Sequence, residues 1–118
     1  MYLTIEMGES AFDPHITLFR LKGILDSMTV PELEIHFVEQ FRSSRVRWIM
    51  DFEDLEYISS AGLKSFVGAV PELRDHGGDI CFVNLPSQLG NIFKTKGVGE
   101  LFKVFASEAD AVRALQRV

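Results

Sequence analysis

The chain has 118 residues, of which 47% are hydrophobic, and its formal net charge is −5. These values predict one domain with a hydrophobic core, and they exclude a disordered chain and a disulfide-stabilised miniprotein. The 12 lysines and arginines are scattered along the chain, whereas a nucleic-acid-binding domain shows a basic stripe, so nucleic acid is not an expected partner.

The first third of the sequence predicts two strands and a helix. Residues 2–7, YLTIEM, alternate between apolar and polar side chains as a short strand does. Residues 15–22 predict a second strand, buried on both faces near its middle. A helix follows, for which Thr29 is the expected N-cap, with Pro31 in the first turn and Glu32 completing a capping box. Its core-facing side chains are Leu33, Phe37 and Phe41, with Val38 expected beside them.

The middle of the sequence predicts a third strand and a second helix. The strand covers residues 46–52, and the segment LEYIS either extends it or forms a short return. The second helix is expected to begin at Ser60 and to be kinked by Pro71. Its core-facing side chains follow helical spacing: Leu63, Phe66, Val67 and Val70.

The last third predicts two more strand–helix pairs. Residues 79–85 form a fourth strand, in which Cys81 is expected to be a small buried side chain. The next helix is expected to be capped by Ser87 and to end at Gly97. LFKVF is the last strand, and Ser107 caps the last helix. The inward side chains of these two helices are Leu89, Ile92, Phe93, Ala111, Val112 and Leu115.

The order of these elements predicts an α/β fold. Strand–helix–strand units pack as right-handed crossovers on a parallel sheet. We therefore expect a single domain over residues 1–118, with a mixed, mostly parallel sheet of four to five strands and about four covering helices. No apolar run approaches the roughly 20 residues of a membrane span, and the N-terminus lacks the basic flank of a signal peptide. A reducing cytoplasmic location is expected.

The sequence lacks the motifs of common enzymes. YISSAGL has no first glycine of a nucleophile elbow, and neither a phosphate-binding loop nor a dinucleotide fingerprint is present. The three histidines lie in separate segments, without metal-ligand spacing. A cluster of four carboxylates could bind a cation, but without calcium-loop geometry it is interpreted as a solvated loop rim: Asp51, Glu53, Asp54 and Glu56. We expect no enzyme, no metal and no cofactor.

Two serines, Ser59 and Ser60, lie where the third strand meets the second helix. One of them is expected to be an ordinary N-cap. The small residues Ala61 and Gly62 follow, which leaves a hydroxyl unshielded and lets another protein approach. A phosphate there would meet free N–H groups and the positive end of the helix dipole. It would add about −1.5 to −2 charges, enough to repel a docked partner.

Three segments carry a resemblance to a known family. They are LKGILD at 21–26, WIMDFEDLEYISSAGL at 48–63, and the second half from RDHGGDICFVNL through LFKVF to the last helix. In order and spacing they resemble the STAS domain, the family of anti-sigma factor antagonists, over nearly the whole chain.

The resemblance implies a binding protein in a serine-phosphorylation partner-switching pathway. The unphosphorylated form would bind an anti-sigma factor that is also a GHKL-type serine kinase. Phosphorylation of the serine that opens the second helix would release it, and a PP2C-type phosphatase would restore it. The matching serine is Ser60. Ser59 stands where the family has an aspartate and is the alternative phosphorylation site, and Asp26 matches a loop acid near the serine. The implied partner surface comprises Asp26, Ser27, Ser59, Ser60, Ala61, Gly62, Leu63 and Lys64.

Two other functions stay open. The chain could be an accessory subunit of a lipid-transport ATP-binding cassette system, which would bind constitutively without phosphorylation and without direct membrane insertion. It could also be a module that senses a small ligand, although the sequence shows no cofactor motif for one.

Overall fold

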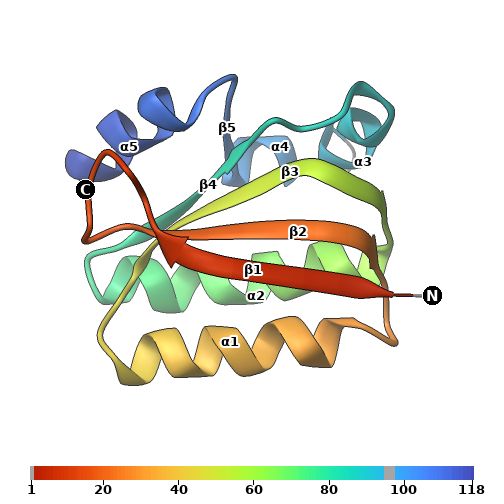
Figure 1. The fold of residues 1–118 in the computed structure, drawn as a ribbon, viewed down its shortest axis with the longest axis horizontal. Coiled ribbons are helices and arrows are strands. Elements are labelled where there is room, and N and C mark those ends of the chain that lie inside the picture. Colours follow the sequence, from red (N-terminus) through yellow and green to blue (C-terminus); the bar gives the residue numbers. More distant parts are fainter. Residues whose placement is uncertain (1, 95–97) are drawn as a thin grey trace.

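The structure is a computed structural model that describes residues 2–94 and 98–118. Five strands form one sheet in the order β1-β2-β3-β4-β5 (Figure 1). β1 pairs antiparallel with β2, and all other neighbouring strands are parallel. The predicted mixed, mostly parallel sheet is confirmed. The strands are β1 (Leu3–Glu9), β2 (Thr17–Leu25), β3 (Arg47–Ile58), β4 (Asp79–Val83) and β5 (Lys103–Phe105).

Helices connect the parallel strands, as the predicted order of elements requires. The segment predicted as one third helix instead holds a 3-10 turn and two short helices. Gly97, the expected end of that helix, lies outside the described residues. The helical elements are α1 (Val30–Arg42), α2 (Ser60–Asp75), η1 (Ser87–Leu89), α3 (Gly90–Lys94), α4 (Val98–Leu101) and α5 (Glu108–Gln116).

The larger hydrophobic cluster fills the face of the sheet that α1 and α2 cover. These two helices run side by side beneath the sheet (Figure 1). Trp48 is fully buried there, and its ring stacks on Phe37 at a centroid distance of 4.7 Å. Phe66 of α2 meets Phe82 of β4 edge-on at 5.2 Å. Aromatic contacts of this kind add to the area buried by each ring, so this face is the main core. Val38 was expected beside the core-facing side chains of α1, but it is 48% exposed because it lies at the edge of that face of the helix.

The smaller cluster lies on the opposite face, under α5. Cys81 is buried in it, as predicted. Burial is the main cause that raises the pKa of this thiol to about 12. The three apolar side chains predicted to face inward from the last helix are all in this cluster: Ala111, Val112 and Leu115. Within the part of the chain that the structure describes, no helix is long and apolar enough to cross a membrane.

β3 is longer than predicted, because LEYIS extends the strand. Thr17 pairs with Trp48 and Leu25 pairs with Ile58, with two shifts of register between these pairs. β3 therefore uses two more residues than β2 over the same span, as β-bulges do. The prediction of a solvated loop rim is wrong, since the four acidic residues lie within β3. One of them, Asp51, is buried, since only 8% of its surface is exposed.

The predicted helix caps had mixed outcomes. Thr29 is the N-cap residue of α1, but its side chain makes no capping hydrogen bond and donates instead to the carbonyl of Ile24 at 2.8 Å. The predicted capping box is therefore wrong. Ser87 does not cap either, because it is already the first residue of η1. Ser107 caps α5 as predicted, accepting from the Asp110 amide at 3.2 Å.

α2 begins at Ser60, as predicted, and continues through Pro71 to Asp75. The kink expected at Pro71 stays a prediction.

Candidate functional site

The candidate site lies at the carboxyl ends of β2 and β3. These strands are parallel neighbours, so the loop after β2 and the turn after β3 meet at one edge of the sheet. The amide of Ser59 donates to the carbonyl of Leu25 at 2.9 Å and ties the two strand ends together. α1 and α2 both begin at this edge, on the right of Figure 1. Asp26 and the serine pair, which the family resemblance placed near each other, are therefore brought to the same end of the sheet.

Ser59 is the serine that caps the helix. Its backbone is extended, and its hydroxyl oxygen accepts a hydrogen bond from the amide of Gly62 at 3.3 Å. Its carbonyl accepts the first helical hydrogen bond, from the amide of Leu63 at 3.0 Å. This is the role of an N-cap serine, and it occupies the Ser59 side chain.

Ser60 is the first residue of α2 and is exposed. Among the described residues, no side chain or backbone group hydrogen bonds to its hydroxyl. The first turn of α2 contains no acidic residue, so the positive end of the helix dipole is not neutralised there. Lys64, four residues later, is also exposed and lies on the same side of the helix. The free hydroxyl therefore stands in a locally positive environment.

Gly62 and Leu63 face inward. A Cβ at Gly62 would lie 2.9 Å from both Ile58 Cγ1 and Leu25 Cγ. Glycine is therefore needed for α2 to approach the strand ends, which is a different reason from the access for a partner argued from the sequence. Leu63 is only 9% exposed and belongs to the main core, as its helical spacing predicted. Ala61 is half-buried. Contact of these three residues with a partner stays a prediction.

The loop after β2 is held by Asp26. One carboxylate oxygen, Oδ1, accepts from the amides of Met28 at 2.9 Å and Thr29 at 3.2 Å. The hydroxyl of Thr29 in turn accepts from the amide of Asp26 at 3.0 Å. These bonds fix the loop and leave Ser27 exposed. The hydrogen bonds of Asp26 are those of a side chain that caps a loop, and its contact with a partner stays a prediction.

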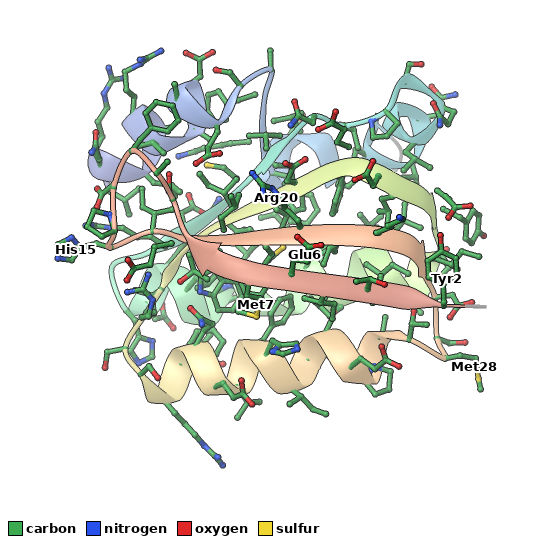
Figure 2. All side chains as sticks on the ribbon, viewed as in Figure 1. Tyr2, Glu6, Met7, His15, Arg20 and Met28 are labelled. Carbon is green, nitrogen blue, oxygen red and sulfur yellow. The ribbon has the colours of Figure 1, made fainter. Side chains whose placement is uncertain are left out.

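Sequence reasoning missed two exposed apolar side chains at this edge. Met28 is 77% exposed and points away from the body of the molecule (Figure 2). Tyr57, two residues before the capping serine, is 53% exposed. An apolar residue between a polar loop residue and a cap, as in Ser27-Met28-Thr29, is a signal that could have identified the first of them.

Tyr2 closes the outer side of this edge. Its carbonyl accepts from the amide of Ile24 at 2.8 Å, and its hydroxyl donates to Glu56 Oε2 at 2.5 Å. The bond to this carboxylate is the main cause that raises the pKa of Tyr2. Gly23, with φ at +105°, allows the tyrosine carbonyl to lie this close, since a Cβ would be 2.5 Å from that oxygen. The tyrosine is thus a fixed part of the rim.

The described residues provide little else for catalysis at this edge. In residues 2–94 and 98–118, no group of three or more His, Cys, Asp or Glu side chains could hold a metal ion. His15 projects at the opposite end of the molecule from Met28 (Figure 2). The arrangement can present a hydroxyl and an apolar rim to another molecule.

The chain is similar to known proteins in sequence and in fold. A family model described as the STAS domain matches residues 9–111. The chain is 29% identical over 108 residues to an anti-sigma-B factor antagonist of Listeria monocytogenes, covering 88% of this chain and 90% of that protein.

Two solved structures share the fold at low sequence identity. An anti-sigma factor antagonist from Mycobacterium paratuberculosis has a TM-score of 0.84 at 19% identity, over 98% of this chain and 95% of the other. The Bacillus cell fate determinant SpoIIAA in its phosphorylated form has a TM-score of 0.70 at 21% identity, over 94% and 98% of the two chains.

Proposed function

The chain belongs to the STAS domain family, and we propose that it is an anti-sigma factor antagonist whose binding is switched off by phosphorylation of Ser60. In this proposal the unphosphorylated chain binds an anti-sigma factor that is also a GHKL-type serine kinase. The kinase transfers a phosphoryl group from ATP to the Ser60 oxygen, and that oxygen loses its proton. The complex then dissociates, and a PP2C-type phosphatase hydrolyses the ester to restore the serine.

The observation that carries this proposal is the free hydroxyl of Ser60 at the start of α2. It is exposed, so a kinase can reach it, and no described group bonds to it, so its modification breaks no native hydrogen bond. A phosphate on it would lie at the positive end of a helix of 16 residues. We therefore expect the fold to tolerate the phosphate well.

The same phosphate would change the surface strongly. It adds about −1.5 to −2 charges to a point that carries none in the unmodified chain. A partner docked over Ser60 with an acidic or apolar surface would face charge repulsion or the cost of burying that charge. Phosphorylation thus controls docking without requiring a change of fold.

Ser59 is the weaker candidate for phosphorylation. Its hydroxyl oxygen accepts the amide of Gly62, so a phosphate there must replace the cap that begins the helix. Its side chain is also only half-exposed. We therefore assign the switch to Ser60, although Ser59 stands where the family has an aspartate.

We propose a binding protein rather than an enzyme. A catalytic serine needs a base within hydrogen-bond reach. Within the described residues, the Ser60 hydroxyl has no such partner.

The decisive experiment is incubation of the chain with the candidate kinase and ATP, followed by mass spectrometry. We expect one phosphate, on Ser60, in the wild type and in Ser59→Ala, and none on Ser60→Ala. Ser60→Ala should bind the kinase permanently, and Ser60→Asp should not bind it. Lys64→Glu should weaken the complex, because it reverses the one charge in the first turns of α2.

Two results would contradict the proposal. If the Ser60→Asp variant binds the kinase as tightly as the wild type does, negative charge at Ser60 does not control binding. Equal binding of phosphorylated and unphosphorylated chain to a membrane permease complex would favour the constitutive accessory subunit instead.

A further inference from the structure

A groove between α1 and α2 begins beside the switch serine. The volume of this open groove is about 380 Å³. Its floor contains Phe37 and Ala69, which are 5% and 7% exposed, and its rim contains Val38, which is 48% exposed. Gly68 also lines it, and a Cβ added there would meet nothing within 4 Å. The groove is therefore an apolar hollow with room above its floor.

We propose that an amphipathic helix of the anti-sigma factor partner docks in this groove while the rest of that partner covers Ser60. The inference rests on the proposed function, and it names the second half of the partner's footprint. An apolar helix face in a groove between two helices is a common mode of recognition.

The groove is continuous with the predicted partner surface. α1 and α2 both begin at the edge that carries Ser60 (Figure 1). Lys64, which the sequence placed in the partner surface, also lines the groove, opposite Glu34 of α1. A partner that covers Ser60 and contacts Lys64 therefore already reaches the mouth of the groove.

The size of the predicted partner surface requires such an extension. That surface has only eight members, and Gly62 and Leu63 among them are buried. A stable complex needs about 20–30 residues on each side. Most of the affinity of such complexes comes from a few desolvated apolar contacts near the centre. Phe37, Val38 and Phe41 can supply these contacts, whereas Ser60 cannot.

The neighbouring open face of the sheet is a poorer site for such contacts. Its hollow beside β3 is lined by three exposed carboxylates, Glu6, Glu53 and Asp54, and by Arg20, which pairs with Asp51. Burying unpaired carboxylates under a partner is costly. Two glutamates also line the groove, but its floor is apolar and can be covered without burying them. The groove is therefore the better continuation of the interface.

The charges along the groove indicate the chemistry of the docking helix. Lys64 and Glu34 line the end near Ser60, and Arg42 and Glu72 line the other end. Among the described residues, neither cation forms an ion pair or a side-chain hydrogen bond. Charged residues of both signs flanking the apolar face of the partner helix, acids beside Lys64 and Arg42 and bases beside the two glutamates, would complement these four side chains. A phosphate on Ser60, one helical turn from Lys64, would compete with the partner for this lysine.

The test measures affinity for the kinase that phosphorylates the wild-type chain, by calorimetry in the absence of ATP. Val38→Glu places a charge on the rim, and Gly68→Leu fills the hollow. Ile35→Glu is the matched control, because Ile35 is 60% exposed on the same helix and does not line the groove. We expect both groove variants to lose about tenfold or more in affinity, which is about 1.4 kcal/mol, and the control to stay within about twofold. Thermal unfolding confirms that each variant is folded.

The outcomes separate this inference from the proposed function. If Ser60→Asp loses binding while Val38→Glu and Gly68→Leu bind like the wild type, the groove is not used and the switch stands. If the control loses as much as Val38→Glu, the effect is not specific to the groove and the inference is overturned. If the groove variants alone lose binding and Ser60→Asp does not, the docking helix is supported and the switch is wrong.

Discussion

Replacing Ser60 with aspartate should stabilise the fold, although the same change should abolish partner binding. The reason is the position of Ser60 as the first residue of α2, where the first turn has no acidic residue. A carboxylate near a helix N-terminus contributes about 0.3–1 kcal/mol. Pairing with Lys64, four residues later, adds about 0.2–0.5 kcal/mol. The hydroxyl that is lost makes no hydrogen bond to a described residue, so its removal costs little.

The expected gain is therefore about 0.5–1.5 kcal/mol in the free energy of unfolding. For a chain of this length the gain corresponds to a rise in Tm of about 2–6 °C. The assay is thermal and urea unfolding of Ser60→Asp beside Ser60→Asn, which has a similar shape and no charge. Salt near 1 M should reduce the difference between the two, since the Debye length falls to about 3 Å.

Ser59→Ala is the control at the neighbouring serine. Its hydroxyl caps α2, so we expect a loss of about 1 kcal/mol. If Ser60→Asp unfolds at a lower temperature than Ser60→Asn, the start of α2 does not favour negative charge. The argument that a phosphate leaves the fold intact would then be wrong.

Two further predictions concern the packing of the fold. Gly62→Ala should lower the free energy of unfolding by about 1–2 kcal/mol in urea titrations, because overpacking against Leu25 and Ile58 outweighs the better helix propensity of alanine; a stabilised variant would contradict this. The Cys81 thiol, with its pKa raised to about 12, should not react with a disulfide reagent at pH 8 until the chain unfolds. Because its folded pKa lies above the reference value of 9.0, its contribution to stability is complete below about pH 9 and should be lost as the pH rises toward 12; a native thiol that reacts at once would refute the burial.

The start of α2 and the exposure of Ser60 were predictable because they depend on local chemistry. A serine pair at the end of an apolar strand, followed by apolar residues at helical spacing, predicts both the first residue of the helix and the exposure of its serine. The length of β3 was less predictable, because Phe52, Leu55 and Ile58 are buried at intervals of three. This spacing fits neither the period of a strand nor a long helix, and it arises from register shifts against β2.

Other features depend on neighbours that are distant in sequence. Gly62 lacks room for a side chain because Leu25 packs against it. The groove exists only because α1 and α2 pack side by side. The role of Thr29 was missed because its hydroxyl prefers the carbonyl of Ile24 to the free amides of its own helix. In each case a tertiary contact overrode a local preference.

β3 has two more residues than the span of β2 with which it pairs. These two residues are not needed to keep the core side chains of β3 in place. Deleting one exposed acid from this region, such as Glu53 or Glu56, would remove a bulge and keep Ile58 opposite Leu25. The buried face would keep its side chains, because ordinary alternation would resume. The strand would lose bend and twist, however, and the serine turn at its end would be aimed in another direction. Short deletions here are thus a way to redirect the serine turn while the interior of the molecule is kept.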